Sequence, residues 1–188
     1  MKSKDLIKVL NTVEQLKCEV RHSWTSTKRQ ESVAEHSWRL CFFALLLKHE
    51  LPDYDMDKVI KMGLIHDLGE AITGDIPSFN KNEMDEKNEK YGINQILGML
   101  DSSLRMELEE LFIEMDEKKT KESKLLNALD KLEAVIQHNE APLETWIPIE
   151  LELNLTYGFE ETTGIKVLEK IRQHVRRDTL NKLSGHRL

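Results

Sequence analysis

Apolar residues recur at steps of three and four along most of this 188-residue chain. In the first such segment they are Leu6, Val9, Leu10, Val13 and Leu16. This spacing predicts an amphipathic helix, and the polar stretch after it, residues 21–30, is predicted to be a loop. Because Gly, Pro and alternating β-branched positions are scarce, the whole pattern predicts an all-α fold.

Capping signals mark where several helices begin. Ser32 followed three residues later by Glu35 is a capping box, and the apolar run behind it predicts a helix to about residue 50. A third helix is predicted over residues 55–66. Residues 69–82 contain two glycines and a Gly-Asp-Ile-Pro turn signal, so a short helical turn and a loop are expected there.

The rest of the chain also shows helical spacing. Further helices are predicted around residues 91–100, 101–115 and 125–136, with a connection near the two prolines at 142 and 148 and a final helix over 160–181. Repeats and shifts of composition are absent from the sequence. We therefore expect residues 1–188 to form one helical bundle of about six to eight helices.

Charge and composition narrow the class of protein. Lys and Arg number 27 and Asp and Glu 34, which gives a net charge of −7. That charge argues against a nucleic-acid polymer as partner, and the apolar runs are far shorter than the roughly 20 residues of a membrane span. Without a signal segment, and with two cysteines, Cys18 and Cys41, that form no disulfide framework, the chain is expected in the cytoplasm.

Four residues form the candidate chemistry: His36, His66, Asp67 and Asp130. Imidazole nitrogens and carboxylate oxygens are ligands for a divalent transition metal, and two of each leave positions open for water. A single histidine or aspartate on a helix is more often a surface or structural residue. The adjacent pair His66 and Asp67 is different, because it directly follows an apolar helical run where an uncompensated charge is costly to bury.

The order of three sequence blocks resembles a known family. His36 lies in Ser-Val-Ala-Glu-His-Ser, residues 66–77 read His-Asp-Leu-Gly-Glu-Ala-Ile-Thr-Gly-Asp-Ile-Pro, and Asp130 lies in Ala-Leu-Asp-Lys-Leu-Glu. These blocks resemble the HD-domain metal-dependent phosphohydrolases, and within them the YfbR-like 5'-deoxynucleotidase subgroup. The resemblance covers about residues 5–140, which leaves 141–188 as a C-terminal helical extension.

The resemblance implies roles for matching positions. His36, His66, Asp67 and Asp130 would bind one divalent metal, and Glu70, Asp75 and Arg21 also fall on matching positions, Arg21 as a substrate contact. Bacterial members of the subgroup place a tryptophan directly after that arginine, where it helps to exclude a ribose 2'-hydroxyl. This chain has His22 there and Trp24 two residues later, so selection between deoxyribose and ribose stays open.

A mechanism can be expected from these residue types. A divalent cation would lower the pKa of a water and hold a phosphate oxygen, with Asp67 also orienting that water. Glu70 or Asp75 would deliver or manage the proton that the leaving sugar oxygen needs.

Substrate contacts are expected from cationic and aromatic side chains. Arg21 is the first candidate for binding the phosphate, with Lys81 and Lys131 behind it. His22 and Trp24 are candidates for contacts with the sugar or base.

The expected activity is hydrolysis of the 5'-phosphate from (deoxy)ribonucleoside monophosphates. The metal is manganese, cobalt, iron, nickel, magnesium or zinc, since the donor set suits all of them to some degree. Alternatives on the same scaffold are a phosphodiesterase, an alarmone hydrolase or a triphosphohydrolase, and a further one is a non-catalytic helical interaction module with a vestigial metal site. The resemblance alone suggests a homodimer.

Overall fold

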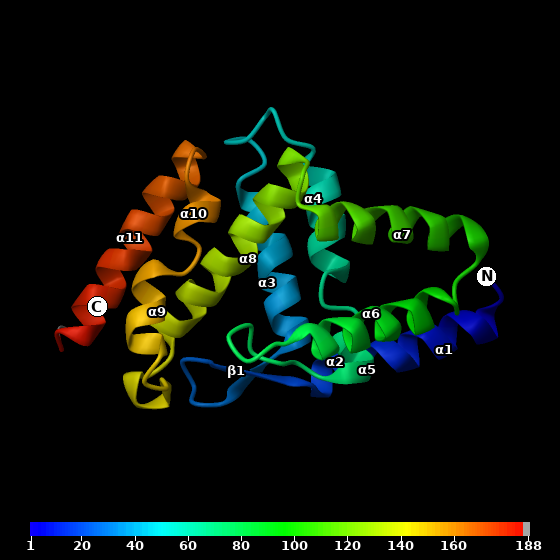
Figure 1. The fold of residues 1–188 in the computed structure, drawn as a ribbon, viewed down its shortest axis with the longest axis horizontal. Helices are drawn as coiled ribbons and strands as arrows, with labels where there is room; N and C mark the ends of the chain where they lie inside the picture. The colour runs from blue at the N-terminus through cyan, green and yellow to red at the C-terminus, as the bar shows by residue number, and fades with distance from the viewer. Residues whose placement is uncertain (186–188) are drawn as a thin grey trace.

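The computed structural model describes residues 1–185, which are mostly helical (Figure 1). The N-terminal half contains α1 (Ser3–Val13), α2 (Gln15–Cys18), α3 (Val33–Leu46), α4 (Met56–Ile65), α5 (Glu70–Thr73) and α6 (Glu83–Leu97). The C-terminal half contains α7 (Ser102–Glu117), α8 (Lys121–Glu140), α9 (Glu150–Thr156), α10 (Phe159–Thr162) and α11 (Lys166–Leu183), with a 3-10 turn at Leu143–Thr145. The predicted all-α fold is confirmed. Within the described residues, no helix has both the length and the apolarity that crossing a bilayer requires.

Helix α8 is the axis of the fold. In Figure 1 it runs diagonally through the middle of the molecule, with α9, α10 and α11 on one side and α6 and α7 on the other. It packs against α3, α4 and α7, and also against α10, α11 and the strand β1 (Val20–Trp24). Side chains from distant parts of the sequence therefore meet along α8.

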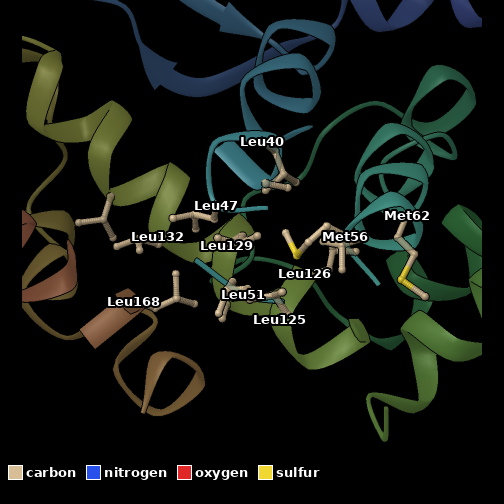
Figure 2. Packing of buried hydrophobic residues seen from close by; sticks show 14 of the residues in the cluster. Leu40, Leu47, Leu51, Met56, Met62, Leu125, Leu126, Leu129, Leu132 and Leu168 are labelled. Carbon is tan, nitrogen blue, oxygen red and sulfur yellow. The ribbon is translucent and has the colours of Figure 1, made fainter. Parts of the chain in front are cut away.

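The main hydrophobic core lies between α3, α4 and α8 (Figure 2). Leu40 of α3, Met62 of α4 and Leu129 of α8 are each 0% exposed. Full burial of such a side chain contributes about 1.5–3 kcal/mol to the free energy of folding. Because the core fixes these three helices relative to one another, it also fixes the polar residues that follow or alternate with the apolar ones.

Two capping boxes begin helices as local sequence rules require. In α3 the Ser32 hydroxyl accepts the N–H of Glu35, and the Glu35 carboxylate accepts the N–H of Ser32. The same reciprocal pair joins Asn82 and Asp85 at the start of α6. These bonds satisfy N–H groups that have no partner inside the helix, so the start of α3 agrees with the prediction from the sequence.

The predicted loop over residues 21–30 is wrong in part. Strand β1 (Val20–Trp24) pairs antiparallel with β2 (Gln30–Ser32). The hairpin is held from outside, because the Gln137 side chain of α8 donates to the carbonyl of Trp24 at 2.7 Å. The sequence of these strands lacks the alternation of apolar and polar residues that predicts a strand, and the hairpin depends on contacts with α8.

The predicted final helix over 160–181 is also wrong at its start. Residues 159–162 form the short α10, and α11 begins only at Lys166. Between them Gly164 has φ of +88°, a left-handed conformation that ends helices and favours glycine. The Gly164 N–H donates to the Glu169 carboxylate at 2.8 Å, which stabilises the break. The connection expected after residue 142 contains a further helix, α9.

Candidate active site

A cavity opens between β1, the loop after α5, and helices α8 and α9. Its volume is about 160 Å³ when open solvent is left out. Several of the candidate residues line it, namely Arg21, His36, Asp67, Glu70, Asp75 and Asp130. The cavity therefore brings together residues that are up to about a hundred positions apart in the sequence.

His36 reaches this cavity from the first turns of α3. It is 1% exposed, and its Nε2 lies 3.1 Å from Asp130 Oδ1 and 3.9 Å from Asp67 Oδ2. The capping box at Ser32 fixes the start of the helix, and Leu40 one turn later anchors the same helix in the core. The imidazole is thus held from both sides.

His66 and Asp67 lie in the turn that follows α4. His66 Nε2 is 3.1 Å from Asp67 Oδ2 and 4.0 Å from Asp130 Oδ1. On its other side, His66 Nδ1 donates to the carbonyl of Gly63 at 2.9 Å. That bond leaves the Nε2 lone pair free, and this buried atom has no hydrogen-bond partner among residues 1–185.

Ligand atoms of His36, His66 and Asp67 all lie within 4.8 Å of one another, as a shared divalent metal requires. Asp130 is not in that group, but its Oδ1 lies 3.1 Å from His36 Nε2 and 4.0 Å from His66 Nε2, so it is the fourth candidate ligand. Two ligand atoms bound at about 2.1 Å to one ion stand roughly 3.0–3.4 Å apart at octahedral or tetrahedral angles, so small adjustments suffice. The Nε2 atom of His66 is buried without a hydrogen-bond partner, so a bound cation would satisfy its lone pair.

Glu133, which the sequence analysis did not single out, holds His36 in place. It is 1% exposed, and its Oε2 accepts from His36 Nδ1 at 2.5 Å, while its Oε1 accepts from Arg39 Nε at 2.5 Å. A carboxylate behind a histidine is the usual support of a metal ligand. Its signal was its position one helical turn after Asp130.

The electrostatics of the four residues favour a bound cation. Burial and the nearby Arg21 lower the pKa of His36, but the carboxylates of Glu133 and Asp130 outweigh them and raise it to about 10. Burial raises the pKa of Asp67, yet the two imidazoles and Arg21 bring it well below its ordinary value. The chain thus holds anionic oxygen atoms around the imidazoles, and without a metal a proton supplies the missing positive charge.

Arg21 enters the cavity from β1. Its Nη1 is 3.6 Å from Glu31 Oε2 and 3.8 Å from Glu133 Oε2, and it has no hydrogen-bond partner within residues 1–185. Burial lowers the pKa of this guanidinium, but the surrounding carboxylates raise it above its ordinary value. The group is therefore a fixed cation with unused donors beside the metal-binding atoms, which suits an oxyanion.

Glu70 and Asp75 contribute two further carboxyl groups. Glu70 is 6% exposed, and burial together with Asp67 and Asp75 raises its pKa to about 10. Burial also raises the pKa of Asp75, against the attraction of Arg21. Both side chains line the cavity, and at neutral pH a carboxyl group with so high a pKa carries a proton that it can donate.

The remaining predicted substrate contacts divide into two groups. His22 and Lys81 line the cavity, with Lys81 also paired to Glu89. Trp24 and Lys131 are not among the residues that line it. Lys131 pairs instead with Glu161, and its ammonium lies 5.2 Å from the centre of the Tyr157 ring.

The cavity also contains polar residues that the sequence analysis missed. His138 of α8, and Glu150 and Asn154 of α9, line it together with Phe79 and Tyr157. Because His138 lies eight residues after Asp130, the two share one face of α8. Helical spacing could have found His138, whereas nothing in the sequence pattern predicted α9.

Comparison with known proteins agrees with this geometry. The model of the HD domain family matches residues 13–172. The 5'-deoxynucleotidase HDDC2 of Homo sapiens is 32% identical over 142 residues, which cover 73% of this chain and 69% of that protein. The protein of the same name from Dictyostelium discoideum is 31% identical over 170 residues, covering 85% and 87%.

A solved structure shows the same fold. A predicted metal-dependent phosphohydrolase from Magnetospirillum magnetotacticum superposes with a TM-score of 0.80 at 24% identity, over 95% of this chain and 93% of the other. The family implies a divalent metal, which the four donor atoms fit. On the family match and the shared sequence, this chain belongs to the HD-domain family.

Proposed function

We propose that this chain is a metal-dependent phosphohydrolase that removes the 5'-phosphate of nucleoside monophosphates, deoxyribonucleotides above all. The observation that carries the proposal is the convergence of two imidazoles and two carboxylates beside a buried arginine, at a cavity that Arg21, His36, Asp67 and Asp130 line and that His66 adjoins through Asp67 and Asp130. The names of the relatives support the substrate class, since they are 5'-deoxynucleotidases at about 30% identity. Phosphate ester hydrolysis needs both a cation for the oxyanion and a proton for the leaving group, and this cavity offers residues for each.

His36, His66, Asp67 and Asp130 are the proposed metal ligands. When bound, a divalent cation supplies Lewis acidity that favours ionisation of a water and offsets negative charge on the phosphate. Glu133 and the carbonyl of Gly63 accept from the outer nitrogens of the two imidazoles. These bonds orient both rings before any ion arrives.

Arg21 is the proposed phosphate-binding residue, with Lys81 as a second cation. The guanidinium is held by Glu31 and Glu133, so its position is fixed before the substrate binds. A preorganised donor fork binds a phosphate dianion bidentately and loses little entropy in doing so. The attraction is local, because the net charge of −7 repels an anion at long range.

Glu70 or Asp75 is the proposed proton donor to the leaving sugar oxygen. Glu70 is the more buried of the two, with a pKa raised to about 10 by burial and neighbouring carboxylates. Asp75 follows Gly74, whose φ of +79° lies at the end of α5, and Asp75 lines the cavity. Asp67 Oδ2 lies 3.1 Å from His66 Nε2 and 3.9 Å from His36 Nε2, and Asp67 is also the proposed acceptor of a hydrogen bond from the attacking water.

A substrate panel tests this function. Chelator-treated protein, supplied with Mn²⁺, Co²⁺, Fe²⁺, Ni²⁺, Mg²⁺ or Zn²⁺ in turn, is assayed for phosphate release from ribo- and deoxyribonucleoside 5'-monophosphates. We expect metal-dependent release that is faster from the deoxyribonucleotides. Equal rates on both sugars would remove the selectivity, and no release from any monophosphate would favour the phosphodiesterase, alarmone hydrolase or triphosphohydrolase chemistry of this scaffold.

Location and assembly remain part of the proposal. A cytoplasmic protein agrees with two free cysteines, Cys18 and Cys41. The homodimer remains a prediction, and size-exclusion chromatography with light scattering checks it directly.

A further inference from the structure

A second cluster of metal-ligating side chains lies in the same cavity but shares no residue with the first. It consists of His22 from β1, His138 from α8 and Glu150 from α9, and one ligand atom from each lies within 4.8 Å of the others. Glu150 Oε1 is 2.8 Å from His22 Nε2 and 3.6 Å from His138 Nε2. Atoms bound to one ion stand at similar separations.

Two of the three ligand atoms are buried without a hydrogen bond, whereas the third, His138 Nε2, lies at hydrogen-bond distance, 3.2 Å, from the Ser23 hydroxyl. Among residues 1–185, neither His22 Nε2 nor Glu150 Oε1 has a hydrogen-bond partner, although the two atoms are only 2.8 Å apart. A simple ion pair between these groups would align a proton between them. Leaving a buried carboxylate oxygen unpaired is costly, so a third group is expected to complete the arrangement.

The surroundings position these side chains. Glu150 is 3% exposed, and its other oxygen accepts the N–H of Ile147 at 2.7 Å, which leaves Oε1 directed at the imidazoles. The indole of Trp146 donates to the carbonyl of His138 at 2.9 Å.

We propose that His22, His138 and Glu150 form a second divalent-cation site. Two histidines and one carboxylate are a ligand set that suits zinc. Three protein ligands leave a fourth position open toward the cavity. The site goes beyond the proposed function, because it does not depend on which phosphate ester the first site hydrolyses. The rival explanation is that the cluster serves only as an uncharged or ion-paired wall for the substrate.

Counting bound ions tests the proposal. Chelator-treated full-length protein is equilibrated with excess Zn²⁺, freed of unbound ion by gel filtration, and its metal content per chain is measured. Wild type is expected to bind two ions. Glu150→Gln and His66→Ala are each expected to bind one, and the double variant none. His49→Gln, which changes an exposed histidine, serves as the matched control and keeps two.

A second variant keeps the result interpretable if Glu150→Gln does not fold, as judged by circular dichroism. His22→Asn changes a partly exposed strand residue and is also expected to reduce the count to one. One ion per chain in wild type, or two ions in folded Glu150→Gln or folded His22→Asn, would overturn the proposal. These counts stand whether or not the protein releases phosphate from nucleotides, so failure of the second site and failure of the proposed function are distinguishable.

Discussion

The two faces of α8 are built on opposite principles. One face carries Leu125, Leu129 and Leu132, which are at most 1% exposed and pack into the main core (Figure 2). The other carries Asp130 and Glu133, whose partners are the imidazole of His36 and the guanidiniums of Arg21 and Arg39. Both faces are well packed, yet only the apolar one gains free energy simply by leaving water.

The charged face is balanced by its own partners. Burial raises the pKa of Glu133, but His36 and Arg39 bring it down to about 2, so the carboxylate stays ionised. Desolvation consumes most of the attraction between buried charges. The comparison shows that the apolar face stabilises the fold. The polar face contributes less to stability, but it holds charged side chains where a metal cation and a phosphate anion can bind.

The largest effect is expected when one of the proposed metal ligands beside the polar face is lost. His66→Ala should lower metal-dependent phosphate release by more than about 100-fold, since even the loss of a residue that only supports a metal ligand costs up to that factor. The assay is initial rate at saturating metal, with the fold checked by circular dichroism. Leu64→Ala, an exposed neighbour on α4, is the control, and an activity loss of similar size in both variants would contradict the separation of roles.

The apolar face is tested by Leu129→Ala. Truncating this fully buried leucine should lower the free energy of unfolding by about 2–5 kcal/mol, because a cavity remains and transfer energy is lost. Urea unfolding at pH 7 measures the change. The rate per folded molecule should stay that of wild type; a large loss of activity in fully folded protein would show that the two faces are not separable.

An intermediate effect is expected from Glu133, the residue of the polar face that supports His36. Glu133→Gln keeps the shape but removes the charge that holds His36 and Arg39, so metal affinity should fall about 10–100-fold. Metal titration of the chelator-treated protein gives the affinity. The matched control is Glu140→Gln, which also changes a partner of Arg39 but does not contact His36; equal losses in both would assign the effect to Arg39.

The smallest effect concerns an ion pair at the surface, for contrast with the buried ones. The hydrogen bond from Arg29 lowers the pKa of Glu35 to about 2. Glu35→Gln should therefore destabilise the protein at pH 7. The difference from wild type should shrink as the pH falls from about 4.5 toward 2, because the unfolded chain then binds a proton at Glu35 that the native carboxylate does not yet bind. Water screens this half-exposed pair. Urea unfolding at several pH values checks it, and a difference independent of pH would contradict the charge argument.

Much of the fold could be predicted because its signals are local. The capping box of Ser32 and Glu35 and the apolar periodicity gave helices close to those observed. The hairpin at residues 20–32 and the break at Gly164 were missed, since the first depends on contacts from α8 and the second on a single left-handed residue. The prediction that residues 1–188 form one domain stays a prediction.

By itself, the sequence determined where α3, α4 and α7 begin, because capping depends on neighbours along the chain. The order of its motifs also named four candidate metal ligands. The tertiary structure alone decided which groups support them. Glu133 meets His36 across 97 residues, and His22, His138 and Glu150 meet from three separate elements. Such contacts depend on how α8 packs against the rest of the molecule, and no local pattern of residues encodes that packing.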